Sequence, residues 1–140
     1  MPFLIRYPKL IKAGSVNDDL CINVDVAPTL LELAGAQIPS AMQGRSMAPL
    51  LRGEVVEGWR DSQFYTYWGA TKHYGIRTDR YTYVKVAGHG AELFDRQADP
   101  DQMRNVIAEE VYSQAITSLE QELQKQIQET DISLDELPGA

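Results

Sequence analysis

Cysteine, histidine and long apolar runs are all scarce in this chain. A single cysteine among 140 residues excludes an internal disulfide and leaves the redox compartment open. The two histidines have no carboxylates beside them at metal-ligand spacing, so the sequence does not indicate a zinc site. No apolar run approaches the length of a membrane span, and no charged segment followed by an apolar one indicates a signal peptide.

Positive charge is also scarce. The formal net charge is −7, which argues against unaided binding to nucleic acid or to an anionic membrane. The charge is unevenly spread, because residues 60–90 hold five Lys or Arg against two Asp or Glu, whereas residues 91–140 hold three against twelve. The middle segment is thus a basic island in an acidic chain.

Residues 24–35 have the pattern of one capped helix. Asp25 is expected to cap the N–H groups of its first turn. Three apolar side chains recur at helical spacing and form one face: Val26, Leu30 and Leu33. A short apolar run over residues 3–6 predicts a buried strand before this helix, and residues 47–51 predict a short helical turn after it.

From residue 61 onward the pattern changes to strands. The aromatic-rich run QFYTYW, residues 63–68, favours a strand. Further strands are predicted over residues 75–78, 81–86 and 91–94, and a tight turn at residues 79–80 separates the first two of these. Such strands assemble most simply as a four-stranded antiparallel meander.

A long C-terminal helix is expected behind these strands. The segment Asp99–Gln102 resembles a capping box, and Asn105 is a further candidate cap. An apolar stripe at helical spacing follows: Ala108, Val111, Tyr112, Ala115, Leu119, Leu123 and Ile127. We expect this helix to lie across one face of the sheet.

Five segments, taken in order, resemble the C-terminal third of the sulfatase family, whose members are relatives of alkaline phosphatase. They are PFLIRYP (residues 2–8), VDVAPTLLELAG (24–35), MQGRSMAPLLRG (42–53), YGIRTDRYTYV (74–84) and ELFDRQADPDQMRNV (92–106). Together they cover nearly the whole chain. Three positions depart from the residue usual in the family, and none of them removes known chemistry: Thr82, Phe94 and Gln102.

The resemblance implies the end of a larger hydrolase. Family members hydrolyse sulfate esters with a formylglycine made from the Cys or Ser of a C-x-P-S-R motif, and with a divalent cation, which the resemblance implies is calcium. These 140 residues contain neither that motif nor recognisable cation ligands. Cys21 is followed by Asn23 and Asp25 where the motif needs Pro and Arg, so we expect it to be a small residue in a buried strand.

The predicted fold class is α+β. By resemblance, residues 1–55 form the last strand and helix of a large α/β domain, and residues 56–140 form a small domain in which the long C-terminal helix packs on the four-stranded antiparallel sheet. The full-length enzyme would act on a sulfated small molecule or carbohydrate, and this chain alone would supply no catalytic residue. Family members are often periplasmic, secreted or lysosomal, and the sequence leaves the compartment open.

Three other interpretations stay open. The chain can belong to a phosphodiesterase or phosphonate hydrolase of the same superfamily, because these enzymes share the C-terminal segments. It can also act as a non-catalytic binding or assembly module, or complete an enzyme built from two chains. Apolar surface in residues 1–55 would normally be covered by the rest of the large domain, so we expect the chain to self-associate through these residues.

Three residues are candidates for contacts with the sugar or aryl part of a substrate: His73, Lys72 and Trp68. His73 precedes the strand of the RTDRYTYV segment, in the region that family members bring toward their pocket. The alternative is an exposed loop histidine without a ligand. The basic island has the same two interpretations, since it can attract an anionic, sulfated substrate or balance the acidic helix.

Overall fold

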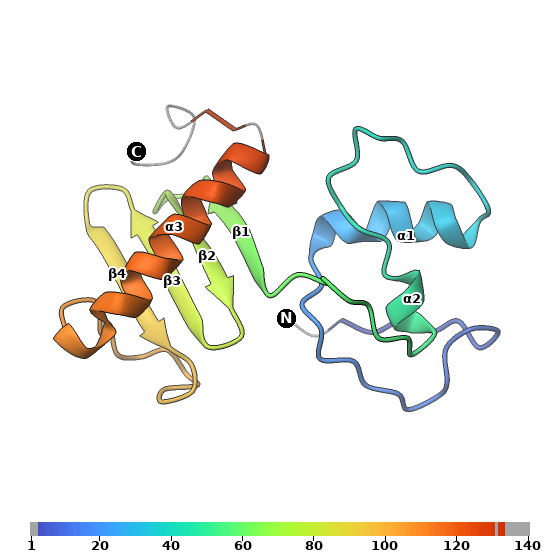
Figure 1. Ribbon diagram of the computed structural model, residues 1–140, viewed down its shortest axis with the longest axis horizontal. Coiled ribbons are helices and arrows are strands. Elements are labelled where there is room, and N and C mark those ends of the chain that lie inside the picture. Colours follow the sequence, from blue (N-terminus) through green and yellow to red (C-terminus); the bar gives the residue numbers. More distant parts are fainter. Residues whose placement is uncertain (1–2, 131, 134–140) are drawn as a thin grey trace. The chain divides into compact units, whose positions relative to one another are not determined.

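The computed structural model describes residues 3–130, 132 and 133 (Figure 1). The chain divides into two compact units, Met1–Arg60 and Asp61–Ala140. Among the described residues, no helix is both long enough and apolar enough to cross a membrane.

The first unit is built around short helical elements: η1 (Asn23–Asp25, a 3-10 turn), α1 (Val26–Leu33) and α2 (Ala48–Leu51). The predicted helices are therefore present. Thr29 joins them, because its hydroxyl donates to the Asp25 carbonyl oxygen at 2.6 Å and accepts from the Met47 N–H at 2.8 Å. Four further side chains are buried in this unit: Pro28, Met47, Ala48 and Leu50.

Asp25 does not cap α1, contrary to the prediction. Because η1 runs directly into α1, Asp25 has helical backbone angles, φ −78° and ψ −17°, rather than the extended angles that point a capping side chain at the first turn. Its carboxylate accepts instead from the N–H groups of Ile22 and Arg45, each at 2.9 Å, and from the guanidinium of Arg60. The side chain is fully buried.

The apolar face of α1 is largely uncovered in this chain. Val26 is 37% exposed, Leu30 is 61% exposed and Leu33 is half-buried.

Residues 3–6 form no strand, so that prediction is wrong for this chain. Phe3 is 56% exposed and Leu4 is 94% exposed. A strand exists through hydrogen bonds to a neighbouring strand, and no strand of the described residues pairs with this segment. Cys21 also lies outside any strand, and it is half-buried rather than buried.

The second unit contains the predicted antiparallel meander (Figure 1). Four strands pair in chain order: β1 (Ser62–Tyr67), β2 (His73–Thr78), β3 (Tyr81–Val86) and β4 (Gly90–Asp95). The register places Phe64, Ile76, Tyr83 and Leu93 side by side on one face. The helix α3, Ser113–Glu129, crosses that face and buries three side chains in the core: Leu119, Leu123 and Ile127. The predicted α+β fold, with a four-stranded sheet and a C-terminal helix, is confirmed.

The segment Asp99–Gln102 is a turn and not the predicted start of the long helix. Gln102 has a left-handed φ of 55°, which a right-handed helix cannot include. The Asp99 carboxylate accepts from the Arg104 N–H at 2.8 Å, so it holds a loop rather than a helix end.

Asn105 also serves the loop rather than the helix. Its Oδ1 accepts from the Leu93 N–H at 3.0 Å, which attaches the segment after the sheet to β4. The long helix begins only after a 3-10 turn, η2, at Glu110–Tyr112. The predicted stripe is confirmed at Tyr112, which packs against the core, and at Leu119, Leu123 and Ile127, which lie in it, but Val111 is 81% exposed.

Candidate functional site

The three candidate residues lie at the connection between β1 and β2, at one edge of the sheet. Trp68 directly follows β1, Lys72 directly precedes β2, and His73 is the first residue of β2. The register pairs His73 with Tyr67, the last residue of β1. Side chains alternate along a strand, so Tyr67 lies on the opposite face from Phe64 and therefore away from α3. The Tyr67 and His73 side chains meet on that opposite face.

The His73 ring is held by two tyrosines and a backbone carbonyl. It stacks on Tyr67, with the ring centroids 5.0 Å apart and the planes inclined by 27°. Tyr65 approaches it edge-on, at 6.2 Å and 76°. The His73 Nδ1 lies 2.8 Å from the Thr71 carbonyl oxygen, and it carries the hydrogen of this bond because a carbonyl oxygen only accepts. Among the described residues, Nε2 has no hydrogen-bond partner.

Gly69 allows the Tyr67 ring to lie over the loop that leaves β1. A Cβ atom added at Gly69 would lie 2.3 Å from the Cζ and Oη atoms of Tyr67. Any side chain at residue 69 therefore displaces this ring. Tyr67 still keeps 52% of its surface exposed, and the adjacent Trp68 keeps 56%.

The structure brings together only part of the predicted set. Trp68 and Lys72 are exposed in the loop that joins β1 to β2, but the rings in contact with His73 are those of Tyr65 and Tyr67. Sequence reasoning missed both tyrosines. The alternation within QFYTYW was the available signal, because it places Tyr65 and Tyr67 on the same face of a strand.

Tyr65 connects this cluster to the middle of the same face. Its hydroxyl lies 3.0 Å from the position of a Cβ at Gly75, so the glycine makes room for the ring. Burial raises the pKa of Tyr65 to about 12, and this phenol therefore stays neutral at physiological pH. Burial, and then the charge of Arg96, lowers the pKa of Arg77, which nevertheless remains a cation.

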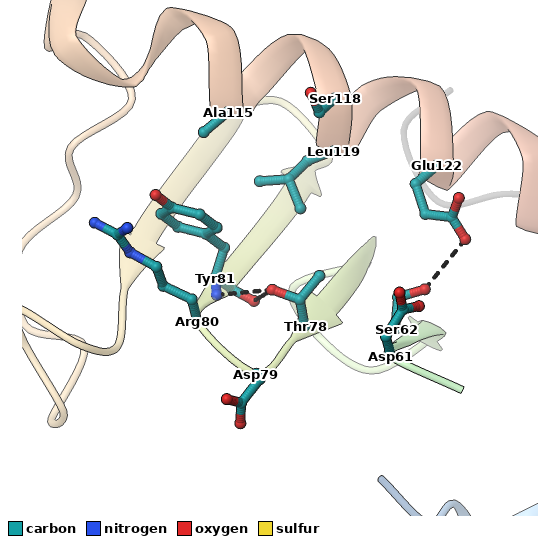
Figure 2. A pocket seen from close by; sticks show the side chains of 10 residues that line it. All are labelled: Asp61, Ser62, Thr78, Asp79, Arg80, Tyr81, Ala115, Ser118, Leu119 and Glu122. Atoms are coloured by element: carbon teal, nitrogen blue, oxygen red, sulfur yellow. Dashed lines mark hydrogen bonds between the residues drawn. The ribbon is translucent and has the colours of Figure 1, made fainter. Parts of the chain in front are cut away.

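A hollow with a volume of about 570 Å³ lies between the β2–β3 turn and α3. Figure 2 shows the Tyr81 ring facing α3 and the hydrogen bond from Ser62 to Glu122, which measures 3.1 Å. Arg80, at its rim, pairs with Asp95 at 2.8 Å. Because these polar groups already bind one another, we interpret the hollow as a groove between the sheet and α3 rather than as a reactive site.

The described residues gather no group of three or more His, Cys, Asp or Glu side chains that could hold a metal ion. Calcium needs several converging oxygen atoms, so these residues do not fit the cation site that the family implies. Asp19, for example, accepts from the Asn17 side-chain amide at 2.8 Å in an exposed loop. Burial, and then the charge of Asp25, raises the pKa of the Cys21 thiol, which disfavours the thiolate that a nucleophile requires.

A family model described as N-sulphoglucosamine sulphohydrolase, C-terminal, matches residues 1–129. The chain belongs to this family. The sulfatase resemblance of the five ordered segments is thereby confirmed, as a C-terminal portion within the alkaline phosphatase superfamily.

Relatives of this sulfatase C-terminal region are much longer than the chain. An N-acetylglucosamine-6-O-sulfatase of Bacteroides thetaiotaomicron is 37% identical over 144 residues, which cover 94% of this chain and 26% of the relative. A structure solved in complex with its substrate, D-glucosamine-2-N,6-O-disulfate, matches 96% of this chain and 28% of that chain, with a TM-score of 0.87 and 33% identity. A phosphonate monoester hydrolase of Agrobacterium radiobacter matches 76% of this chain and 24% of that chain, with a TM-score of 0.66 and 26% identity.

Proposed function

We propose that this chain is the C-terminal part of a sulfatase-like sulfuric ester hydrolase and that it does not catalyse hydrolysis alone. The family match over residues 1–129 supports the assignment to this family. The chain spans only 26% of the Bacteroides sulfatase, which supports the view that it is one part of a longer enzyme. Sulfuryl transfer needs an activated nucleophile and a cation that act together on the transition state. The C-x-P-S-R motif of the family nucleophile does not occur in these 140 residues.

The two parts of the chain have separate roles in this proposal. Residues 1–55 form the end of the large α/β domain, and residues 56–140 form the small C-terminal domain. The exposure of Val26 and Leu30 supports the first assignment, because an apolar helix face packs against further elements of such a domain. Calcium and formylglycine would be held by the rest of the enzyme.

The proposed substrate is a sulfated carbohydrate. The name of the Bacteroides relative and the disulfated glucosamine bound in the solved structure support this class. We assign His73, Lys72 and Trp68 to contacts with the sugar, since His73 presents its Nε2 and the other two side chains are exposed beside it. The positive charge of residues 60–90 suits an anionic ligand.

A chimera tests the hydrolase proposal. This chain replaces the matching C-terminal region of the Bacteroides N-acetylglucosamine-6-O-sulfatase, and the purified protein is assayed with N-acetylglucosamine 6-sulfate. We expect metal-dependent turnover by the chimera, and none above blank by the 140-residue chain alone or by the relative without its C-terminal region. A soluble, folded chimera without activity contradicts the proposal, and so does metal-dependent turnover by the chain alone.

A phosphonate monoester hydrolase is the second candidate. The match to the Agrobacterium enzyme, at 26% identity, favours it. To distinguish the two candidate functions, this chain also replaces the matching C-terminal region of the Agrobacterium enzyme, and that chimera is assayed with a phosphonate monoester. Restored phosphonate hydrolysis beside an inactive sulfatase chimera supports the second candidate, and the opposite pattern supports the first. Two folded but inactive chimeras would favour a non-catalytic binding or assembly module.

We also propose that the isolated 140-residue chain self-associates through residues 1–55. Apolar side chains of this region are at least a third exposed, among them Phe3, Leu4, Val24, Leu30, Met42 and Val55. Exposed apolar surface of this kind binds another apolar surface. In a purified sample the apolar surface available for this contact is that of a second copy of the chain.

A further inference from the structure

We propose that Arg77 and Arg96 form a docking point for the large domain of the enzyme, and that a carboxylate side chain of that domain binds these two guanidinium groups. The inference rests on the proposed function, because it assumes that a large domain completes this chain. It deepens that function by naming a contact that joins the two parts. The assigned occupant is a protein carboxylate and not the substrate.

Arg77 is a half-buried cation that has no carboxylate partner in the part of the chain that the structure describes. It alternates with Ile76 and Thr78 along β2, and Ile76 lies in the core under α3, so Arg77 lies on the opposite sheet face. Among the described residues, none of the ion pairs includes its guanidinium. Burial is the largest cause that lowers the pKa of Arg77, and the charge of Arg96 is the next. The surroundings of this side chain therefore disfavour its charge.

Arg96 brings a second guanidinium to the same end of the sheet. Its Nη1 donates to the Asp79 carbonyl oxygen at 2.5 Å and to the Thr78 carbonyl oxygen at 3.4 Å, so it lies against the residue next to Arg77. Its Nε is buried and has no hydrogen-bond partner among the described residues. A buried donor of a charged group that lacks a partner costs free energy. An anion beside two such cations stabilises both of them.

The two carboxylates of the sheet strands do not serve this pair of arginines. Asp95 binds Arg80 at 2.8 Å and is nearly fully buried. Glu92 lies on the same sheet face as Arg77, but the strand register places it in the row of Gly75, which is one row away from Arg77. Glu92 also forms no ion pair with any described residue. The counter-ion must therefore come from outside the described residues.

A carboxylate of the large domain suits this position. The chain spans 26% of the Bacteroides relative, so most of the proposed enzyme lies outside these residues. A guanidinium and a carboxylate form two parallel hydrogen bonds, and such a pair strengthens when a second domain excludes water from it. A dissolved anion at a half-exposed site is instead screened by salt and water. The pair would thus fix the small domain against the large one.

Arginine modification by phenylglyoxal tests the docking point without any substitution. The reagent is applied to the 140-residue chain and to the sulfatase chimera, and mass spectrometry follows each arginine. Arg104, whose side chain is 74% exposed, is the internal reference. Relative to Arg104, we expect Arg77 to react roughly 10-fold or more slowly in the chimera than in the chain, because the bound carboxylate sequesters its guanidinium. Inorganic sulfate at about 50 mM should protect Arg77 in the chain alone by less than about 2-fold.

A matched pair of variants measures the missing partner directly. Arg77→Met and Arg80→Met each keep an unbranched stem and remove the guanidinium. In the chain alone, Arg77→Met should leave the melting temperature unchanged or raise it by up to about 3 °C, because no carboxylate loses its partner. Arg80→Met should lower it by about 4 °C or more, because Asp95 stays buried without its counter-ion. In the chimera both variants should lower it, by about 2 °C or more.

Three results would overturn the docking point. The first is an equal rate of Arg77 modification in the chain and in the chimera. The second is a loss of stability in the chain alone that is as large for Arg77→Met as for Arg80→Met. The third is protection of Arg77 by inorganic sulfate as strong as in the chimera, which would assign a small anion instead. An active chimera combined with any of these leaves the proposed function standing and removes the docking point. A folded, inactive chimera in which Arg77 is protected does the reverse.

Discussion

Arg60 binds the carboxylate of Asp25 across 35 positions of the chain, and its Nη2 donates to Oδ1 at 2.8 Å while Nη1 donates to Oδ2. Asp25 is fully buried, and the Arg60 side chain is only 11% exposed. The Arg60 Nη1 also donates to the Leu20 carbonyl oxygen at 3.2 Å. This bidentate ion pair therefore connects Arg60, the last residue of the first unit, to the start of α1.

Substitution of Asp25 should therefore destabilise the first unit strongly. In Asp25→Asn the Arg60 guanidinium keeps its charge but loses its buried counter-ion, and we expect a loss of about 3–5 kcal/mol in the free energy of unfolding. Urea denaturation followed by the Trp59 indole NMR signal measures it. Arg52→Gln, which breaks an exposed pair with Glu54, is the control and should cost less than about 1 kcal/mol. Equal stability of Asp25→Asn and the unsubstituted chain would contradict this role of the pair.

The pair of Arg80 with Asp95 predicts a loss of stability in acid. Hydrogen bonds from Arg80, opposed by burial, lower the pKa of Asp95 from 3.8 to about 2. The ionised carboxylate therefore stabilises the fold above about pH 4, and this contribution disappears as the pH falls from about 4 to about 2. Thermal unfolding should show a difference between the unsubstituted chain and Asp95→Asn that shrinks across this interval. Asp101→Asn, at an exposed turn, is the control, and a difference independent of pH would count against the assignment.

Gly75 should tolerate no side chain. A Cβ there would lie 2.2 Å from the Tyr83 carbonyl oxygen, which belongs to the neighbouring strand β3. Gly75→Ala must push β2 and β3 apart, and we expect a cost of about 3 kcal/mol or more in thermal or urea unfolding. Because the nearest atom is backbone, removing the Tyr65 ring in Gly75→Ala/Tyr65→Leu should not restore stability. Recovery in that double variant would show instead that the tyrosine is the obstacle.

The apolar face of α1 should control self-association. We expect the 140-residue chain to sediment as a dimer or larger species at roughly 50 μM, because the Leu30 face is uncovered. Leu30→Lys should shift it toward monomer. Val111→Lys, at a residue 81% exposed in the second unit, should leave the assembly unchanged. A clean monomer for the unsubstituted chain would refute the proposal.

Elements specified by neighbouring residues could be predicted from the sequence. The strand pattern from residue 63 to residue 94 depends on alternation within each strand and on a tight turn at residues 79–80, and β1 to β4 follow it closely. The C-terminal half of α3 likewise follows its apolar spacing, with Leu119, Leu123 and Ile127 in the core. The family resemblance followed from the order of five such local segments.

The remaining features depend on residues that are distant along the chain. Asp99 and Asn105 have the residue types of helix caps, but their side chains bind the Arg104 and Leu93 N–H groups, and the helix starts at Ser113 instead. Residues 3–6 have the composition of a strand and lack a strand to pair with.

The sequence by itself determined the sheet, its order and the family of this protein, because side-chain alternation and turn chemistry act between near neighbours. Only the tertiary structure decided the partner of Asp25 and the stacking of Tyr67 on His73 over Gly69. A buried carboxylate binds the strongest donor that the fold brings within reach, and ring contacts depend on strand register and loop path. Both are properties of the assembled chain rather than of any single segment.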